Sequence, residues 1–411
     1  MEGSERVLAE FRPGLSVYVQ GAVGEPLALR AILQSAPEAL AGVSLTSCLL
    51  PGMNDFDYAG LDARTKLTVF MLPAALRTSF DEGRVSTIPL AYSQVAAFLR
   101  HGSAPDVAIF QVTPPDADGN CSFGPCTDFA SLVWPRAGRR IGFVNPSLPR
   151  PVRGPTIAFD ALDVVIEADG PFITAVEAEP TAEQLTIARR VAALVPHGAA
   201  IQTGIGGAPA AVPALLKDHG DLVVRSGMVT EGYRTLAEEG ALALGGHITG
   251  LALGSPAFMA FACEHFEFAD ATVTHGAASL ATVERLTSIN SALEIDLFGQ
   301  ANIEWQGGRL VSGVGGAPDF TRAARRSRGG RAIIALPSTA RGGEVSRIVS
   351  RLSSPTASIP RDEIDTIVTE HGAAQLRALS LDDRAAALIA IAAPEHRDRL
   401  AEEWVAIRRA L

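Results

Sequence analysis

The sequence predicts an α/β protein made of two similar domains with a cleft between them, and three observations support this fold class. The chain has 411 residues, more than one hydrophobic core usually serves. The segment 199–232 reads as strand, glycine turn, helix and second strand, the alternation that builds parallel sheets. A similar segment near the N-terminus indicates a duplicated unit.

The first copy of this unit spans residues 12–33 and the second spans 196–216. Each copy reads as an apolar strand, a Gly-x-x-Gly-x-Pro turn and a helix. Chance similarity between two glycine turns is the alternative explanation. Two matched halves would leave a cleft, and clefts between domains are common ligand sites. The matched positions are Gly21 with Gly204, Gly24 with Gly207, and Pro26 with Pro209.

The first domain is expected to contain further strands at 105–110 and 140–145, with the turn-rich loop 111–124 between them. Residues 170–180 are polar and acidic and contain proline breakers, as a linker does. Thr181 and Gln184 then stand at the positions of a capping box for the next helix. We therefore predict domains 1–180 and 181–411.

The second domain shows the same alternation of strands and helices. Strands are predicted at 199–202, 222–224, 289–298, 331–336 and 364–368. A turn is expected at 226–230, helices are expected at 209–216 and 231–240, and a helical tail at 382–411.

Composition and charge exclude several classes of function. A net charge of −10 opposes binding to nucleic acid or to an anionic membrane, and no apolar run approaches the roughly 20 residues of a membrane span. The acidic N-terminal segment lacks the apolar core of a signal peptide, so we expect a cytoplasmic protein. The four cysteines are too scattered for a disulfide framework or a zinc knuckle. We expect free thiols and no metal site.

Seven separated sequence blocks carry a family resemblance. They are GIGGAP from Gly204, SINSALEIDLFGQANIE from Ser288, SGVGGAPDFTRAA from Ser312, IIALPSTA from Ile333, SRIV from Ser346, IVTEHGAAQLR from Ile367 and RAAALIAIAAPEHRDRL from Arg384. In this order they closely resemble the acetyl-CoA hydrolase/transferase family, which includes 4-hydroxybutyrate CoA-transferase-like enzymes. The resemblance runs from about residue 10 to residue 405, and the first-half loop VTPPDADGNCSFG adds to it.

The resemblance implies two CoA-transferase-type α/β domains with an acyl-CoA bound in the cleft between them. Coenzyme A would be present as a thioester substrate, so no permanently bound cofactor is expected. The second partner would be a small-molecule acceptor that the sequence does not identify. We also expect a homo-oligomer.

One position departs from the family pattern. Family members carry a motif similar to H-T-E-M-F-S-D-G, whose glutamate takes the acyl group as a mixed anhydride and then holds CoA as a glutamyl thioester. Over this motif the chain reads RSGMVTEG at residues 225–232, so the glutamate falls on Gly227. Glycine has no side chain to carry an acyl group. We therefore expect water or a second substrate to attack the thioester directly.

Three side chains are candidate catalytic groups. Glu231 lies about one helical turn beyond Gly227, so a slipped alignment would let its carboxylate reach the same pocket; a first-turn helix acid is its alternative role. Glu294 and Asp296 share one strand face and are expected to have a supporting polar role; carboxylates that share a face would raise the pKa of one of them and suit it as a general base for water, and a buried structural pair is the alternative. His275 lies in a turn between predicted elements, and a structural histidine is its alternative role.

The glycine turns are the candidate CoA-binding and oxyanion-binding elements. Their backbone N–H groups can hold a developing negative charge, while a tight strand-to-helix connection is the structural alternative. Relatives often have glutamine after the second turn, whereas this chain has Ala317, which predicts a changed acyl pocket. The candidates are Gly204, Gly206 and Gly207 in the first turn and Gly313, Gly315 and Gly316 in the second.

Other functions remain open on the sequence. One is ordinary CoA transfer in which Glu231 or another carboxylate substitutes for the missing glutamate. A second is a catalytically silent CoA-binding subunit. A nicotinamide-binding domain is disfavoured, because the strand after the glycine turn ends in Arg225 where an acidic ribose ligand is expected.

Overall fold

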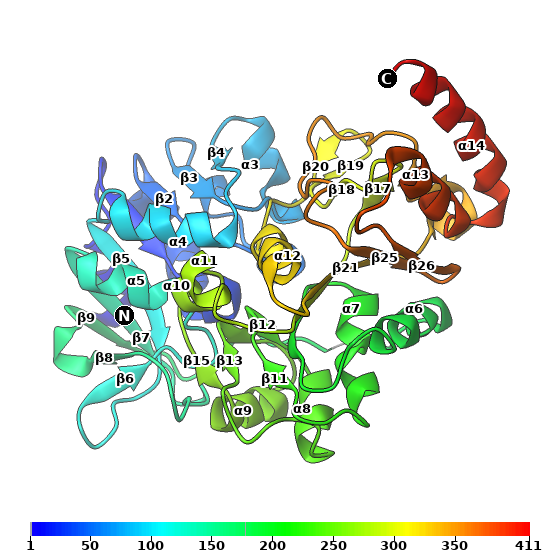
Figure 1. Cartoon of the computed structure of the whole chain (residues 1–411). Coiled ribbons are helices and arrows are strands. Elements are labelled where there is room, and N and C mark those ends of the chain that lie inside the picture. Colours follow the sequence, from blue (N-terminus) through cyan, green and yellow to red (C-terminus); the bar gives the residue numbers. More distant parts are fainter. Residues whose placement is uncertain (1, 177) are drawn as a thin grey trace.

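Two sheets, one in each half of the chain, form the framework of the protein (Figure 1). The computed structural model describes residues 2–176 and 178–411. Met1, at the start of the predicted first domain, and Glu177, in the predicted linker, lie outside the described residues. The α/β class predicted from the sequence is confirmed.

The first sheet is entirely parallel and is formed before residue 170. Its inner strand β5 (Val107–Val112) is buried at all positions, as is usual for a parallel strand covered on both faces. In spatial order the seven strands are β4 (Val85–Thr87), β3 (Lys66–Val69), β2 (Ser44–Thr46), β1 (Ser16–Val19), β5 (Val107–Val112), β7 (Arg139–Val144) and β9 (Val164–Glu167). The helices of this half are α1 (Glu2–Leu8), α2 (Leu27–Ser35), α3 (Arg77–Asp81), α4 (Tyr92–His101) and α5 (Ala130–Val133).

The second sheet is parallel except for its last strand, which pairs antiparallel. In spatial order its six strands are β11 (Val223–Val224), β10 (Ala200–Thr203), β16 (Leu286–Asn290), β21 (Arg331–Ala335), β25 (Thr366–Thr369) and β26 (Gly372–Gln375). The helices are α6 (Ala182–Ala192), α7 (Gly207–Ala211), α8 (Gly232–Glu238), α9 (Pro256–His265), α10 (Ala271–Thr274), α11 (Ala277–Leu280), α12 (Ala317–Arg326), α13 (Leu381–Ala390) and α14 (Pro394–Arg409).

Short strands link loops around the two main sheets. The antiparallel pairs are β6 (Asn120–Ser122) with β8 (Thr156–Ala158), β19 (Trp305–Gln306) with β20 (Arg309–Leu310), and β22 (Thr339–Ala340) with β23 (Val345–Ser346). The parallel pairs are β12 (Met228–Val229) with β14 (Leu251–Ala252) and β13 (Ile248–Thr249) with β15 (Glu267–Phe268). A three-stranded sheet joins β18 (Ala301–Asn302), β17 (Glu294–Asp296) and β24 (Ile348–Val349).

In both main sheets the order of successive strands reverses at the strand that precedes the repeated glycine turn. β1 lies between β2 and β5, and β10 lies between β11 and β16. Such a switch point leaves a crevice beyond the carboxyl ends of the strands, where ligands bind in open α/β sheets. In the first half, the Gln20 side chain just beyond β1 donates to the Cys126 carbonyl at 3.0 Å. In the second half the crevice opens onto a cavity.

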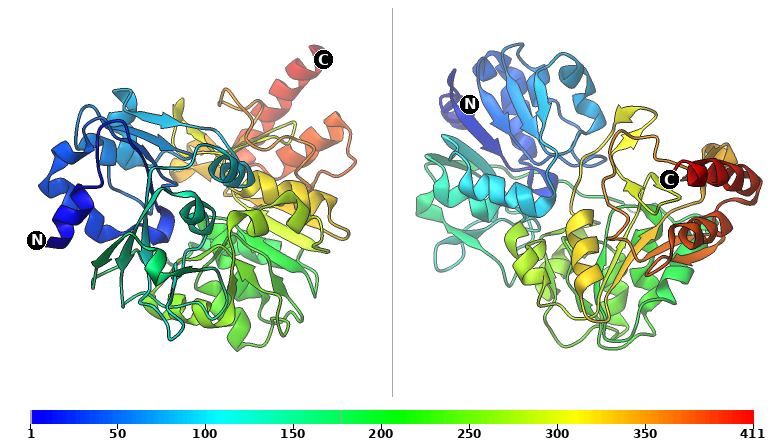
Figure 2. Two further views of the ribbon diagram at one scale, coloured as in Figure 1. Left: turned by 90° about the vertical axis from the view of Figure 1, so that its left-hand side faces the viewer. Right: turned by 45° about the horizontal axis from the view of Figure 1, so that its top comes forward.

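The two halves share one hydrophobic core. Buried side chains of the first half, such as Tyr18 and Phe110, belong to the same cluster as Ile201 and Ile289 of the second half. Figure 2 shows the halves side by side, with α14 at the end of the second half that is remote from the N-terminus. The division at residue 180 stays a prediction.

Several predicted elements differ in detail from the structure, and prolines explain two of the differences. The helix predicted at 209–216 is α7 followed by a 3₁₀ turn that starts at Pro213, which has no N–H to continue the α-helix. The helical tail is two helices, and Pro394 begins the second. The strand predicted at 289–298 is split into β16 and β17, and the turn predicted at 226–230 contains β12.

The cysteine and capping predictions are confirmed. All four cysteines are buried free thiols. The Thr181 hydroxyl oxygen accepts from the Gln184 N–H at 3.2 Å, and the Gln184 side-chain oxygen accepts from the Thr181 N–H at 2.9 Å. Across the described ranges, every helix is too short or too polar to cross a membrane.

Candidate active site

A cavity of about 440 Å³ lies beyond the carboxyl ends of β10 and β16. The first half contributes Leu50, Pro51, Met71 and Tyr92 to its lining. The second half contributes the two glycine turns, the strand-end residues Gln202 and Asn290, and Gly227, His275 and Arg347. The cavity therefore depends on both halves of the chain.

An amide pair forms one side of the cavity. Gln202 near the end of β10 and Asn290 at the end of β16 exchange two side-chain hydrogen bonds of 3.1 Å each. A Cβ atom on Gly204 would lie 2.3 Å from the Asn290 oxygen, so only glycine fits beside this pair. The next turn residue, Gly206, has a φ of 135°, which a residue with a side chain rarely adopts. The first glycine turn therefore packs directly against the Asn290 side chain of this pair, and a larger residue at Gly204 would displace it.

The imidazole of His275 fills the space in front of Gly227. A Cβ atom on Gly227 would lie 2.4 Å from Cε1 of His275, and one on Gly316 would lie 2.5 Å from Nε2. The ring also contacts Tyr92 and Phe320, each with its ring centroid 4.8 Å away. A glutamate side chain at residue 227 has no room while this imidazole is in place.

Burial and the neighbouring Thr274 hydroxyl determine the charge and the tautomer of His275. Burial lowers its pKa from 6.5 to about 3, so the ring is neutral near pH 7. The Thr274 hydroxyl lies 2.8 Å from Nδ1 and 3.3 Å from the Asp270 carbonyl oxygen. A hydroxyl that donates to this carbonyl accepts from Nδ1–H, which leaves the lone pair on Nε2, the nitrogen beside Gly316.

Helix α12 presents backbone donors next to this nitrogen. Gly316 is the N-cap residue, and Gly316 and Ala317 both line the cavity. Within the described part of the chain, no hydrogen bond uses the N–H groups of these two residues. The site therefore combines unpaired N–H donors with an imidazole acceptor, the pair of functions needed to hold a carbonyl oxygen and an attacking nucleophile.

The second glycine turn is attached to the first half of the chain. The Leu72 N–H donates to the Ser312 carbonyl at 3.3 Å, and the Tyr92 N–H donates to the Gly315 carbonyl at 3.1 Å. A Cβ atom on Gly313 would lie 2.1 Å from the Phe70 carbonyl oxygen, so the two backbones approach closely only because this residue is glycine. These contacts align α12 with the walls that the first half provides.

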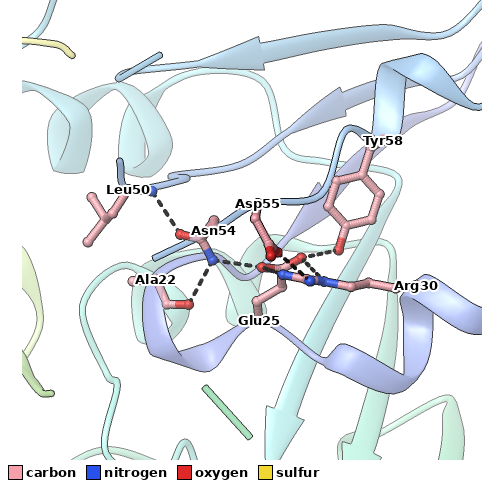
Figure 3. A network of polar contacts seen from close by, with 7 residues as sticks. All are labelled: Ala22, Glu25, Arg30, Leu50, Asn54, Asp55 and Tyr58. Atoms are coloured by element: carbon pink, nitrogen blue, oxygen red, sulfur yellow. Dashed lines mark hydrogen bonds and ion pairs between the residues drawn. The ribbon is translucent and has the colours of Figure 1, made fainter. Parts of the chain in front are cut away.

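The loop that carries Leu50 is held by a buried polar network (Figure 3). The Glu25 carboxylate accepts from both Nε and Nη2 of Arg30, from Asn54 at 2.7 Å and from Tyr58 at 2.7 Å. Asn54 in turn accepts from the Leu50 N–H at 2.8 Å. A fully buried carboxylate with all its partners thus fixes one wall of the cavity.

The structure brings together only part of the predicted site. Gly204, Gly206, Gly313, Gly315 and Gly316 all line the cavity. Their role in binding CoA or an oxyanion stays a prediction. Gly207 does not line the cavity, because it faces the Gln184 side chain, whose Nε2 would be 2.3 Å from an added Cβ.

The two candidate glutamates lie elsewhere, which corrects the expected geometry. The Glu231 carboxylate turns to the start of α9, where it accepts from the Ser255 N–H at 2.8 Å, so it does not reach the pocket in front of Gly227. Glu294 accepts from Asn302 at 3.1 Å and from the Ser353 backbone and hydroxyl. Each carboxylate thus has its hydrogen-bond partners outside the cavity.

The sequence analysis missed Tyr92, the amide pair of Gln202 and Asn290, and Arg347. A sequence signal exists for Gln202, which ends an apolar segment just before the first glycine turn, whereas Asn290 is followed by no glycine turn. No local pattern marks Tyr92, which reaches the cavity only through packing of the two halves. In the ranges that the structure describes, no three metal-binding side chains are grouped to hold an ion.

Comparison with known proteins gives consistent matches over most of the chain. The acetyl-CoA hydrolase/transferase N-terminal domain matches residues 2–177, and the C-terminal domain of the same name matches residues 254–404. The 4-hydroxybutyrate coenzyme A transferase of Clostridium kluyveri is 30% identical over 412 aligned residues, 98% of this chain and 96% of the relative.

Solved structures show the same similarity. RipA from Yersinia pestis superposes with a TM-score of 0.91 at 28% identity and covers 99% of this chain and 97% of its own. A 4-hydroxybutyrate CoA-transferase from Porphyromonas gingivalis gives a TM-score of 0.80 at 30% identity and covers 100% and 97%.

Proposed function

Because the chain belongs to the acetyl-CoA hydrolase/transferase family, and so acts on an acyl-CoA as a transferase or hydrolase, we propose that water or a second substrate attacks its thioester directly. No glutamyl-CoA intermediate would form. CoA is a substrate in this family and not a permanently bound cofactor. The observation that carries the proposal is the imidazole of His275 in front of Gly227.

The lining of the cavity supports this mechanism. Among the described residues, no aspartate or glutamate lines the cavity, so no carboxylate stands ready to take the acyl group. The two glutamates that the sequence nominated are engaged in hydrogen bonds away from it. Covalent transfer through a mixed anhydride needs such a carboxylate within bonding distance of the thioester carbon.

The same lining offers a route for direct attack. The thioester carbonyl oxygen would accept from the N–H groups of Gly316 and Ala317, and such donors lower the barrier by roughly 3 to 4 kcal/mol each. Nε2 of His275 would accept a hydrogen bond from the attacking water or acceptor. The nucleophile's oxygen adds to the carbonyl carbon, the C–S bond breaks, and its electron pair leaves with the sulfur of CoA. When water is the nucleophile, the proton that it loses passes to the departing sulfur, so the products are a carboxylic acid and the free thiol of CoA. A neutral imidazole of low basicity orients the nucleophile in this scheme.

Mass spectrometry tests the proposal. The protein is incubated with a panel of acyl-CoA thioesters while free thiol is measured, then treated with borohydride or hydroxylamine and analysed intact. We expect thiol release without any glutamyl adduct. A CoA-bound glutamate would establish ordinary CoA transfer by a substitute carboxylate, and binding without thiol release would establish a silent CoA-binding subunit.

A substitution tests the role of His275 in the same assay. We expect His275→Ala to lower kcat for thiol release about 100-fold, because the nucleophile loses its acceptor. His265→Ala is the control, since His265 lies outside the cavity at the end of α9. Equal activity of the two variants would contradict the assigned role.

A further inference from the structure

Arg347 lines the cavity on a rigid backbone. It lies between β23 and β24, and its N–H donates to the Ser338 carbonyl at 2.8 Å. Its own carbonyl accepts from the Ile295 N–H at 2.8 Å. The neighbouring residues Ser346 and Ile348 are buried, so the position of Arg347 is set by the fold.

The guanidinium group of Arg347 is half-buried and has no close partner. Over residues 2–176 and 178–411, no side-chain hydrogen bond or ion pair involves it, and burial lowers its pKa. Glu183 and Glu370 raise the pKa only through charge at a distance, and Glu370 is itself bound by the Ser338 N–H at 2.9 Å. Removing a cation from water without a partner costs free energy. The position therefore suits an anion that arrives with a ligand.

The composition of the cavity narrows the kind of anion. Of the described lining residues, Arg347 alone carries a formal charge near pH 7, because His275 is neutral and no acidic residue is present. The thioester group is neutral. An acyl group or an acceptor can carry a carboxylate, which a guanidinium binds through two parallel hydrogen bonds.

We propose that Arg347 is a specificity-determining residue that binds a substrate carboxylate in this cavity. The carboxylate belongs either to the far end of a dicarboxylic acyl group or to the acceptor that attacks the thioester. This inference rests on the proposed function, because it assumes that the cavity is the acyl site.

Two thioesters with four-carbon acyl chains test whether the carboxylate belongs to the acyl group. Succinyl-CoA carries a terminal carboxylate and butyryl-CoA does not. If the acyl group is the source, we expect Arg347→Met to lower kcat/KM for succinyl-CoA about 10- to 100-fold relative to butyryl-CoA, as expected for loss of a charge-assisted contact. If the acceptor is the source, the variant should instead raise the KM for acetate by a similar factor in a butyryl-CoA assay. Arg347→Lys should restore part of either loss.

The control and the binding measurement make the outcome decisive. Arg351→Met removes an exposed arginine that stacks on Phe298 and does not line the cavity. This variant should leave kcat/KM for both thioesters and the KM for acetate unchanged. Equal effects of the Arg347 and Arg351 variants in all arms, or weaker binding of free CoA in Arg347→Met, would overturn the carboxylate assignment.

Calorimetric dissociation constants separate this inference from the mechanism. They are measured for succinyl-CoA, butyryl-CoA and acetate with the wild-type protein and each variant. If no thioester is turned over, the proposed function fails, and these constants still decide whether Arg347 binds a carboxylate.

Discussion

At residue 227, the lack of a side chain leaves space that the imidazole of His275 occupies. His275 lies against Gly227 on one side and Gly316 on the other, at distances that exclude a Cβ atom on either residue. The three positions are therefore mutually dependent. The absence of a side chain at Gly227 makes room for the imidazole.

Adding one methyl group tests this dependence. We expect Gly227→Ala to lower the free energy of unfolding by about 1 to 3 kcal/mol, because the new Cβ overlaps the His275 ring. Gly245→Ala is the control, since no atom lies within 4 Å of the added Cβ there. Urea unfolding measures both. In Gly227→Ala/His275→Ala the clash should disappear, so strictly additive losses would contradict the contact.

The buried neutral His275 also makes stability depend on pH. Its pKa is about 3 in the folded protein and 6.5 when exposed, so between these values the unfolded chain binds one more proton than the folded chain. The contribution is complete above pH 6.5 and is lost as the pH falls toward 3. We expect up to about 1.4 kcal/mol of stability to be lost per pH unit in this window.

The variant His275→Gln isolates this effect. The difference in unfolding free energy between wild type and variant, measured by urea titration between about pH 5 and pH 7, should grow with pH. A difference that stays constant over this range would show that His275 does not remain neutral in the fold.

At the scale of elements, helices and loops are joined to the cavity by buried polar contacts. α2 begins just after Glu25, and the Glu25 network reaches across to the loop that carries Leu50 (Figure 3). α12 begins at the second glycine turn, and its Asp319 carboxylate accepts from the N–H and hydroxyl of Ser93 on α4. Each wall of the cavity is held by an element remote in sequence.

The Glu25 network offers a matched pair of substitutions on one arginine. Arg30 bonds the buried Glu25 and also the exposed Asp55. We expect Glu25→Ala to cost about 3 to 5 kcal/mol, because it leaves Arg30, Asn54 and Tyr58 without their acceptor. Asp55→Ala should cost less than about 1 kcal/mol. Denaturant unfolding compares them, and similar losses would contradict a special role for the buried carboxylate.

At the scale of the whole molecule, the two halves pack against each other through a common hydrophobic cluster. The largest core cluster contains side chains from both sheets, and backbone contacts such as that of Tyr92 with Gly315 cross between them. The cavity exists only where the halves meet. The homo-oligomeric state, the cytoplasmic location and the acceptor stay predictions from the sequence.

A shared core predicts a single unfolding transition. Trp134 reports on the first half, whereas Trp305 and Trp404 report on the second. Variants that keep one tryptophan each should show coincident fluorescence transitions in urea, because neither half retains its buried surface alone. Two separated midpoints would show that the halves unfold independently.

The sequence could predict features that depend on neighbours along the chain. The strand, glycine turn and helix of each half, and the capping box of Thr181 and Gln184, follow from short patterns whose physics is local. The resemblance also indicated the family, whereas the alignment of the family's catalytic glutamate with Gly227 stays a prediction. The local elements and the family could be predicted because hydrophobic periodicity, turn residues and motif order are properties of consecutive residues.

The identity of the group in the cavity was decided by tertiary structure. Nothing near His275 in the sequence indicates that its ring lies against Gly227 and Gly316, which are 48 and 41 positions away along the chain. The approach of Glu231 to the same pocket looked reasonable from helical spacing, yet its carboxylate caps α9 instead. Side-chain direction and burial depend on packing between distant segments, and only the folded chain determines them.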